Sequence, residues 1–414
     1  MSNLIIQNAT QLVTCSGFSA KRGESMRNLE IIEDGALVIE NGLIRKVGRT
    51  TEILKGVDLS LYTQIDASGK SVLPGFVDSH THFPFGGYRP EEYSWRLKGA
   101  SYMEIMERGG GIVNTMAATR NAAKAELREL GRRRLDAMLT MGVTTVEGKS
   151  GYGLDLETEI KQLEVMAELN AEHPLDVVST FLGAHAVPPE FNGRADGYID
   201  FVIASVLPEV VQRGLARCCD VFCEKGVFSV EQSRRLLMAA QDEGLMAKIH
   251  ADEIVSLGGA ELAAELGAVS ADHLLQASDE GIDAMARTGV VATLLPGTAF
   301  SLKEPYARGR QMIDRGCAVA LASDFNPGSC FTFSIPLIAA LAALKMGLTP
   351  EEIVSALTIN GAAAVGQADR IGSLDVGKVG DLVVLSYPSY LYIPYHLGIN
   401  IVETVVKDGV VVVG

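Results

Sequence analysis

Residues 74–82 are Pro-Gly-Phe-Val-Asp-Ser-His-Thr-His, and this stretch decides how the rest of the chain is interpreted. The run Val72–Ser79 predicts a buried strand, which ends at two histidines, His80 and His82. Residues two apart in an extended chain face the same side, so both imidazoles can reach one ion. We therefore expect a buried strand that presents a pair of metal ligands at its C-terminal end.

Seven further apolar runs follow this strand and alternate with helical patterns. The predicted strands are Val143–Glu147, Asp176–Gly183, Asp220–Cys223, Ala247–His250, Ala271–Leu275, Val290–Leu295 and Ala318–Ser323. The helical patterns include Ala117–Met141, Glu157–Glu172, Ser229–Glu243 and Ser256–Leu266. Eight strands that alternate with helices over about 290 residues favour an α/β fold, a (β/α)8 TIM-like barrel, over an open sheet.

Both ends of the chain carry β patterns that the middle lacks. Near the start, Asn41-Gly42 separates two strand patterns, Ala36–Glu40 and Leu43–Val47, which is a strong hairpin signal. The Val-rich segment Ile401–Gly414 is similar, so we expect antiparallel strands at both ends. The predicted domains are a composite β-sandwich from residues 1–70 and 366–414, and a barrel from residues 71–365.

The chain has 414 residues and a formal net charge of −15, from 36 basic and 51 acidic side chains. Nucleic acids and anionic membranes require a basic footprint, so neither is expected as a partner. A small anionic substrate remains compatible, because a single Arg can bind a carboxylate. No apolar run reaches the roughly 18 residues that a membrane span needs, and the start lacks signal-peptide features. We expect a cytoplasmic protein.

Five of the seven histidines lie at the C-terminal ends of predicted strands, the face on which barrel enzymes build their active sites. His250 ends the fifth strand, with Glu253 three residues later, and Asp324 follows the eighth. Together with His80 and His82, they offer three imidazoles and a carboxylate. Such a ligand set suits Zn²⁺ or a similar ion.

Longer motifs resemble the amidohydrolase superfamily. Residues 74–82 are similar to its strand-one signature, and Gly372–Val383 (Gly-Ser-Leu-Asp-Val-Gly-Lys-Val-Gly-Asp-Leu-Val) to its return into the β domain. Four segments resemble the imidazolonepropionase family within it: His82–Arg89 (His-Phe-Pro-Phe-Gly-Gly-Tyr-Arg), Lys149–Gly153 (Lys-Ser-Gly-Tyr-Gly), Leu182–Pro189 (Leu-Gly-Ala-His-Ala-Val-Pro-Pro) and Asp324–Ser329 (Asp-Phe-Asn-Pro-Gly-Ser). The resemblance is collinear over nearly the whole chain.

This resemblance implies an activity and a cofactor. The expected reaction is metal-dependent hydrolysis of the cyclic amide C–N bond of 4-imidazolone-5-propanoate to N-formimidoyl-L-glutamate, the third step of histidine degradation. His80, His82, His250 and Asp324 are implied to hold one ion per subunit, Zn²⁺ or Fe, in a homodimer. The two-metal form of the superfamily has a carboxylated Lys after strand four, where this chain has Glu224.

The resemblance also implies roles for individual residues. Asp324 would accept a proton from the attacking water, Glu253 would act as acid and base, His273 would bond the water, and His185 would donate to the substrate carbonyl. The implied substrate-binding residues are Arg89, Tyr152, His185, Glu253, Asn326, Gly328 and Ser329. Arg89 is the natural partner of the propionate carboxylate. The glycines 109–111 are expected to form a flexible cover.

Two other functions remain open. A deaminase of the same superfamily, acting on cytosine, guanine or a related ring, would share the metal ligands, Glu253 and His273, but Arg89 with Tyr152 favours an anionic ligand. A non-catalytic scaffold on the same fold usually lacks metal ligands, and all four are present here.

Overall fold

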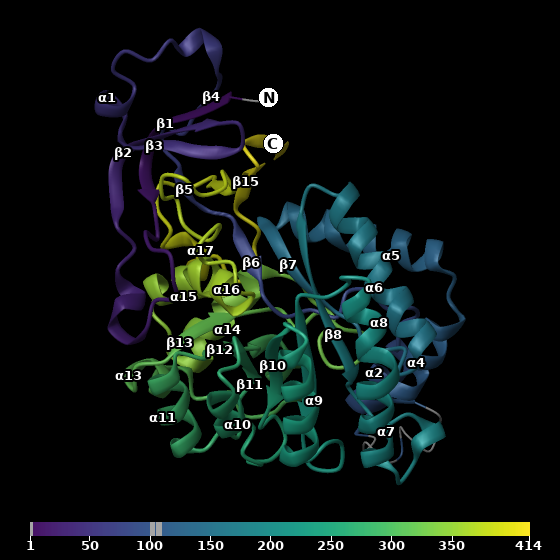
Figure 1. Ribbon diagram of the computed structural model, residues 1–414. Helices are drawn as coiled ribbons and strands as arrows, with labels where there is room; N and C mark the ends of the chain where they lie inside the picture. Colours follow the sequence, from purple (N-terminus) through teal and green to yellow (C-terminus); the bar gives the residue numbers. More distant parts are fainter. Residues whose placement is uncertain (1–2, 100–103, 105–109) are drawn as a thin grey trace.

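The computed structural model describes residues 3–99, 104 and 110–414, which build a barrel and a second sheet formed by both chain ends (Figure 1). The barrel sheet has the order β13-β12-β11-β10-β9-β8-β7-β6, and the ladders between these neighbours are parallel. Its strands are β6 (Phe76–Asp78), β7 (Val143–Lys149), β8 (Asp176–Ala184), β9 (Cys218–Cys223), β10 (Met246–Ala251), β11 (Ser270–His273), β12 (Val291–Leu294) and β13 (Ala318–Leu321). The predicted (β/α)8 fold is confirmed.

Hydrogen bonds just beyond the strand ends close the barrel between β6 and β13. The backbone N–H of Asp324 donates to the carbonyl of His80 at 2.9 Å, and the N–H of His82 donates to the carbonyl of Phe325 at 2.9 Å. This seam fixes the main chain of three expected metal ligands relative to one another.

Helices pack around the outside of the barrel (Figure 1). They are α2 (Pro90–Leu97), α4 (Ile112–Asn121), α5 (Lys124–Thr140), α6 (Leu156–Glu172), α7 (Ala195–Phe201), α8 (Leu207–Gln212), α9 (Val230–Asp242), α10 (Gly259–Leu266), α11 (Asp279–Thr288), α12 (Pro296–Leu302), α13 (Gly309–Asp314), α14 (Ile335–Met346), α15 (Pro350–Leu357) and α16 (Ile359–Ala364). The largest apolar cluster joins their inner faces to the strands, as at Leu127, Leu163 and Leu236. The barrel core is therefore the space between strands and helices.

The predicted first strand, Val72–Ser79, is in fact two strands. Its first half is β5 (Ser71–Pro74), which pairs within the terminal sheet, and only its second half, β6, belongs to the barrel. The break falls at Gly75, where a Cβ atom would lie 2.2 Å from Oγ1 of Thr144. The chain crosses between the two sheets at this close contact, which only glycine permits.

The predicted helix Ala117–Met141 is likewise divided, into α4 and α5. Ala122 and Ala123 between them have extended backbone, although neither Gly nor Pro marks the break in the sequence. Lys161, from α6, donates through Nζ to the carbonyls of Thr119, Arg120 and Ala122. A distant lysine thus satisfies the carbonyl groups that the end of α4 leaves free.

The terminal sheet has the order β16-β15-β14-β5-β1-β2-β3, with β4 beside β1. Its strands are β1 (Asn3–Val13), β2 (Ile31–Glu40), β3 (Leu43–Arg49), β4 (Thr63–Asp66), β5, β14 (Leu382–Leu385), β15 (Val402–Lys407) and β16 (Val410–Val413). The β2–β3 hairpin at Asn41-Gly42 is confirmed. The expectation of purely antiparallel pairing is wrong for two ladders, because β1 pairs in parallel with β4 and β5 after the chain crosses back. Two short helices, α1 (Thr50–Ile53) and α17 (Tyr392–Tyr395), complete the chain.

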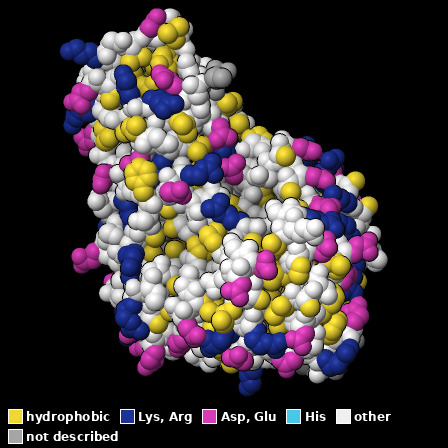
Figure 2. All heavy atoms as spheres, in the orientation of Figure 1, with side chains coloured by type: hydrophobic (Ala, Val, Ile, Leu, Met, Phe, Trp, Pro, Cys, Tyr) yellow, Lys and Arg dark blue, Asp and Glu magenta, His cyan; other side chains and the backbone are white. Residues whose placement is uncertain are grey.

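The surface shows no continuous basic area on the face drawn in Figure 2, where Lys and Arg alternate with Asp and Glu among the described residues. This pattern agrees with the net charge of −15. Across the described ranges, no helix combines the length and the apolar character that crossing a bilayer requires.

Candidate active site

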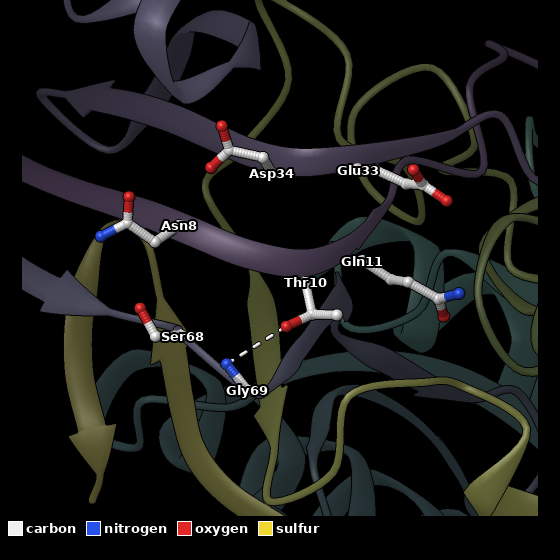
Figure 3. Close-up of a pocket in the computed structure, with 7 residues that line it drawn as sticks. All are labelled: Asn8, Thr10, Gln11, Glu33, Asp34, Ser68 and Gly69. Atoms are coloured by element: carbon white, nitrogen blue, oxygen red, sulfur yellow. Dashed lines mark hydrogen bonds between the residues drawn. The ribbon is translucent and has the colours of Figure 1, made fainter.

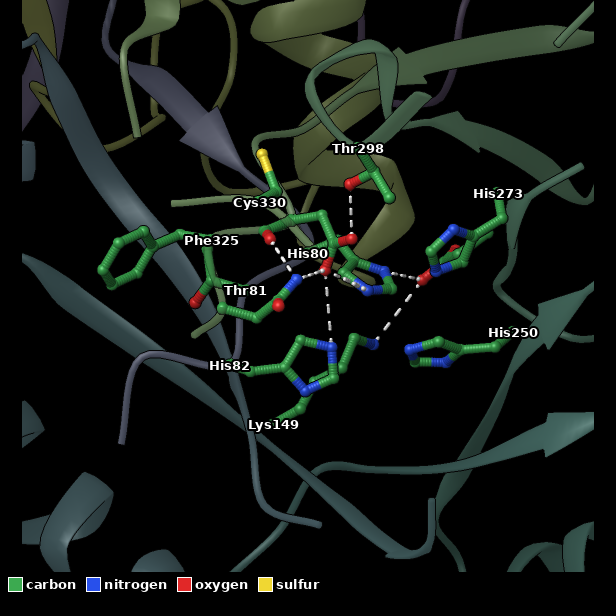
Figure 4. Close-up of polar contacts among 12 residues, drawn as sticks. His80, Thr81, His82, Lys149, His250, His273, Thr298, Phe325 and Cys330 are labelled. Atoms are coloured by element: carbon green, nitrogen blue, oxygen red, sulfur yellow. Dashed lines mark hydrogen bonds and ion pairs between the residues drawn. The ribbon is translucent and has the colours of Figure 1, made fainter. Parts of the chain in front are cut away.

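Four imidazole rings from three barrel strands converge at the C-terminal end of the barrel. His80 and His82 follow β6, His250 lies in β10 and His273 ends β11, and all four are buried. The ring centroids of His80 lie 5.3 Å from His82, 4.6 Å from His250 and 5.3 Å from His273. Figure 4 shows these rings around one space, with Lys149 beside them. Asp324 closes the group, with its Oδ1 3.5 Å from Nε2 of His80 and 3.6 Å from Nε2 of His82.

These side chains suit a metal ion. Ligand atoms of His80, His82 and Asp324 all lie within 4.8 Å of one another, and His250 forms similar groups with His80 and His273 and with His82 and His185. Within the described part of the chain, the buried Nε2 atoms of His80 and His250 have no hydrogen-bond partner. Burying such an atom unpaired costs about 1–3 kcal/mol, a cost that a bound ion would remove. The donor set is one that Zn²⁺ or Fe accepts.

Carboxylates behind two of the rings set their orientation. Nδ1 of His80 lies 2.6 Å from Oδ2 of Asp272, and Nδ1 of His250 lies 3.0 Å from Oδ2 of Asp220. A carboxylate close to Nδ1 favours protonation of that nitrogen. The lone pair on Nε2 is then free to bind a metal ion. Burial lowers the pKa of His80 well below its ordinary value, so this ring is neutral and able to act as a ligand.

The backbone of Asp324 is left-handed, with φ of 51°. Its carboxylate accepts a bond from Oγ1 of Thr298 at 2.6 Å and one from Nδ2 of Asn326 at 3.0 Å. Burial raises the pKa of Asp324 to about 6. A carboxylate with such a pKa can hold and release a proton near neutrality.

Glu253 lies beside His273, with its Oε2 3.5 Å from Nδ1 of that ring. Burial, and then the charge of Asp324, raise the pKa of Glu253 to about 8. Both flanking residues are anchored. Asp252 accepts four backbone N–H bonds from residues 257–260, and the N–H of Ile254 donates to Oε2 of Glu224 at 2.8 Å. Glu253 is thus a titratable group on a fixed loop.

His185 has a defined tautomer. Its Nδ1 lies 3.1 Å from the carbonyl oxygen of Gly151, which can only accept, so the proton is on Nδ1. Burial lowers the pKa of His185 to about 3, so the ring is neutral and Nε2 has a lone pair. This arrangement offers an acceptor, whereas the resemblance implies a donor to the substrate carbonyl. His185 stacks on His82 with ring centroids 4.9 Å apart.

Arg89 rests against Gly328. A Cβ atom at position 328 would lie 1.9 Å from Nη2 of Arg89, so only glycine leaves room for the guanidinium. The side-chain oxygen of Asn326 accepts bonds from the N–H groups of Gly328 and Ser329, both at 2.8 Å. Asn326 also bonds Asp324, so this loop is fixed relative to the histidine cluster. The guanidinium itself is paired with Glu92, whose Oε2 lies 3.4 Å from Nη1 of Arg89.

Tyr152 packs between that cluster and the β6 loop. Its ring lies 5.7 Å from the ring of His82, 5.3 Å from His185 and 6.3 Å from Phe85. On the other side of Phe85, the buried Arg134 places its guanidinium 3.6 Å above the ring and donates to the carbonyl of Phe85 at 2.8 Å. The predicted site residues are therefore brought together, except that Gly109 of the expected glycine cover lies outside the described residues.

Sequence reasoning missed several charged side chains that support the site. These are Asp220, Lys248, Asp252 and Asp272. A signal existed for three of them, because Asp220, Lys248 and Asp272 interrupt otherwise apolar strand patterns. Lys248 also precedes His250 by two positions, which places both on one strand face.

A surface hollow of about 580 Å³ lies elsewhere, on the terminal sheet (Figure 3). It is lined by Asn8, Thr10, Gln11, Glu33, Asp34, Ser68 and Gly69. None of the predicted site residues borders it, so the candidate chemistry belongs to the buried end of the barrel.

Comparison with known proteins now identifies the family. The amidohydrolase family model matches residues 71–413. The imidazolonepropionase of Parabacteroides distasonis is 63% identical over 408 residues, covering 99% of this chain and 98% of that protein. The imidazolonepropionase of Clostridium tetani is 61% identical over 410 residues, covering 99% and 98%.

Solved structures with the same fold are more distant in sequence. A triazine hydrolase variant superposes with a TM-score of 0.76 at 18% identity, covering 99% of this chain and 94% of that one. A zinc-bound adenosine deaminase from Xanthomonas campestris gives 0.70 at 18% identity, covering 100% and 93%. These likenesses show the fold alone. By its family match and its high identity to full-length relatives, the chain belongs to the amidohydrolase family and, within it, to the imidazolonepropionases.

Proposed function

We propose that the chain hydrolyses the cyclic amide of 4-imidazolone-5-propanoate to N-formimidoyl-L-glutamate. The observation that carries this proposal is the presence of three buried histidines and one aspartate, close enough to share an ion, together with the guanidinium of Arg89, which lies against Gly328. The ligand set suits hydrolysis of an amide, and the guanidinium suits an anionic group on the same molecule.

We propose that His80, His82, His250 and Asp324 hold one ion, Zn²⁺ or Fe. Such an ion, when bound, would lower the pKa of a water and polarise the ring carbonyl. Glu224, at the position where a two-metal site would need a carboxylated lysine, instead accepts backbone N–H bonds from Lys225 and Ile254. Both of its oxygens are thus engaged by the loops, which supports a single-metal site.

Glu253 and Asp324 are positioned to move the protons. Hydrolysis transfers one proton from the attacking water and delivers one to the ring nitrogen as the C–N bond breaks. With its pKa raised to about 8, the carboxyl group of Glu253 can take up and release a proton near neutral pH. His273 lies close to Glu253, and its backbone is left-handed with φ of 74°. We propose that its ring forms a hydrogen bond to the attacking water.

The remaining residues orient the substrate. Arg89 would bind the propionate carboxylate in bidentate form, and Tyr152 would pack against the ring. His185, with its lone pair on Nε2, would accept from a ring N–H rather than donate to the carbonyl. Asn326, Gly328 and Ser329 form the loop that supports Arg89 and borders the ligand.

Purified protein tests the function directly. Imidazolonepropionate is followed by its ultraviolet absorbance, and the product is identified by mass spectrometry. We expect loss of substrate with stoichiometric formation of formimidoylglutamate. Release of ammonia from cytosine or guanine, without turnover of imidazolonepropionate, would instead select the deaminase alternative.

We further propose a homodimer of two-domain subunits, with the β-rich unit from residues 1–70 and 366–414 and the barrel from residues 71–365. The separate sheets of the barrel and the termini support the division into two domains, with the difference that β5 (Ser71–Pro74), at the start of the barrel range, pairs within the terminal sheet. The proposed dimer rests on the resemblance of the sequence. Light scattering on the purified protein tests it through a mass of twice 44.1 kDa.

A further inference from the structure

Five charged side chains form a buried layer beneath the histidine cluster, inside the barrel. This buried charge layer consists of Glu147, Lys149, Asp220, Lys248 and Asp272, and each is 0% exposed. Three carboxylates face two ammonium groups, so the layer has a net charge of −1 when all five are ionised. Charged groups are almost never fully buried unless they are paired, so each must have a defined partner.

Two carboxylates of this layer contact expected metal ligands. Oδ2 of Asp272 lies 2.6 Å from Nδ1 of His80, and Oδ2 of Asp220 lies 3.0 Å from Nδ1 of His250. Oδ1 of Asp220 also accepts a bond from the backbone N–H of His250 at 3.1 Å. The position of each carboxylate therefore sets the direction in which the Nε2 atom of its histidine points.

One ammonium group reaches both of these carboxylates. Nζ of Lys149 donates to Oδ2 of Asp220 at 2.7 Å and to Oε1 of Glu147 at 2.9 Å, and it lies 3.5 Å from Oδ2 of Asp272. In Figure 4, the side chain of Lys149 lies directly beside the rings of His80 and His250. The ammonium thus bridges the supports of two rings that come from different strands.

Lys248 has the same charge and burial but different contacts. Its Nζ lies 3.6 Å from Oδ2 of Asp272 and 3.3 Å from Oε2 of Glu147, and it donates to the carbonyls of Ala364 and Ser79. No contact joins it to Asp220 in the described structure. Both lysines contact Asp272, so the contact with Asp220 is what distinguishes Lys149. Lys248→Met therefore controls for the loss of one buried ammonium beside Asp272 while the ammonium beside Asp220 stays in place.

We propose that Lys149 is a positioning residue for the metal site, which holds the carboxylates of Asp220 and Asp272 so that His80 and His250 are oriented before the ion binds. Lys149 donates no hydrogen bond to the ring of His80 or His250. It therefore acts on the orientation of these rings only through the carboxylates of Asp220 and Asp272. The inference rests on the proposed metal site. It predicts that this lysine governs zinc affinity although it does not coordinate zinc.

The experiment measures zinc binding alone, by competition with a chromophoric chelator, on wild type, Lys149→Met and Lys248→Met. We expect the zinc dissociation constant to rise about 10–100-fold in Lys149→Met and by less than about threefold in Lys248→Met. Equal losses in both variants would overturn the proposal, and so would unchanged affinity in Lys149→Met. Failure of the wild type to bind zinc would instead refute the metal site itself.

A double variant controls for misfolding caused by a change in the net charge of the buried layer. Glu147→Gln combined with Lys149→Met removes one charge of each sign, so the net charge of the layer stays at −1 while Asp220 still loses its ammonium partner. We expect this protein to fold and to retain the weak zinc binding. Recovery of wild-type affinity would show that Lys149 only balances charge, and would overturn the proposal. Nitrogen-15 spectra of the metal-free protein should show mixed tautomers at His80 in the double variant and a single Nδ1–H tautomer in wild type, where Nδ1 lies 2.6 Å from Asp272.

Discussion

The barrel end and the terminal sheet use the same backbone conformation for different purposes. In the terminal sheet, left-handed residues are Asn8, Asp34, Asn41 and Asp408, residue types that tolerate this conformation well. At the barrel end, His273, Leu274 and Asp324 adopt it. For histidine and leucine it costs about 1–3 kcal/mol each. In the first set, Asn41 and Asp408 lie in hairpin turns, and Asn8 and Asp34 lie within β1 and β2, where Asn8 falls at a register shift. The second set directs side chains into a site.

The interiors of the two regions also differ, in the polarity of their buried side chains. The core of the terminal sheet is aliphatic, with Leu12, Leu37, Ile39 and Val384 all buried. The barrel end buries histidines, carboxylates and lysines instead. Buried charges weaken a fold compared with apolar packing, so the comparison shows which region is built for stability and which for chemistry.

The sharpest test of this contrast changes one aspartate in each region to asparagine. Asp324→Asn keeps the shape but removes a metal-ligating carboxylate, and we expect kcat to fall by roughly 10⁴-fold. Asp34→Asn, at another left-handed position, should leave kcat unchanged, since asparagine tolerates that conformation. Steady-state kinetics at saturating zinc give the result. Similar activity of the two variants would contradict the division of roles.

Glu253→Gln should give the next largest effect. Removing a general acid and base lowers kcat by about 10²–10³-fold, with KM nearly unchanged. Zinc content measured beside the kinetics is the control, because Glu253 is not a proposed ligand. Full activity with bound zinc would remove Glu253 from the mechanism.

The same variant tests the stability cost of the site in metal-free protein. The pKa of Glu253 is raised from 4.5 to about 8, so between these pH values the folded chain holds a proton that the unfolded chain has lost. The protonated carboxyl group of Glu253 therefore contributes fully to the free energy of unfolding below pH 4.5, and this contribution is lost as the pH rises to 8. Denaturant unfolding should show Glu253→Gln gaining roughly 2–4 kcal/mol over wild type from pH 4.5 to pH 8.5. A pH-independent difference would contradict the shift.

Gly328→Ala should have a smaller effect, confined to substrate binding. The new Cβ atom would lie 1.9 Å from Nη2 of Arg89, so the guanidinium must move. We expect KM to rise about tenfold, with kcat within threefold of wild type. Gly197→Ala, where the nearest atom to the new Cβ is 3.9 Å away, is the control. An unchanged KM would show that Arg89 does not hold the carboxylate from this position.

The smallest effect on turnover should come from the terminal sheet. Leu37→Ala empties part of its aliphatic core, and the free energy of unfolding should fall by about 2–5 kcal/mol. Turnover per folded molecule at 25 °C should match wild type. A change in KM together with the stability loss would mean that the sheet also shapes the site.

Much of this architecture could be predicted from the sequence. The alternation of eight strand patterns with helical patterns predicted the barrel. The strand-end placement of His80, His82, His250 and Asp324 then predicted the cluster, because parallel strands end on one face. The break at Ala122 could not be predicted, since the lysine that caps α4 comes from position 161. Three-dimensional contacts alone revealed it.

The pairing within the buried charge layer could not be predicted either, although charged residues interrupt its apolar strands. Asp220 and Asp272 lie inside apolar strands. The sequence around them does not show that Asp220 supports His250 and that Asp272 supports His80, because each histidine follows or lies in a different strand. The tautomer of His185 depends on the carbonyl of Gly151, a backbone group that no side-chain motif records. Motifs therefore predicted which residues form the site, and contacts decided how each one acts.

The proposed hydrolysis of imidazolonepropionate depends on one ion in the histidine–aspartate site. The most direct measurement strips the protein with a chelator and titrates zinc back while following conversion of 4-imidazolone-5-propanoate to formimidoylglutamate. We expect no turnover in metal-free protein and a linear rise that saturates at one zinc per chain. Full turnover without metal, or none with one zinc bound, would contradict it.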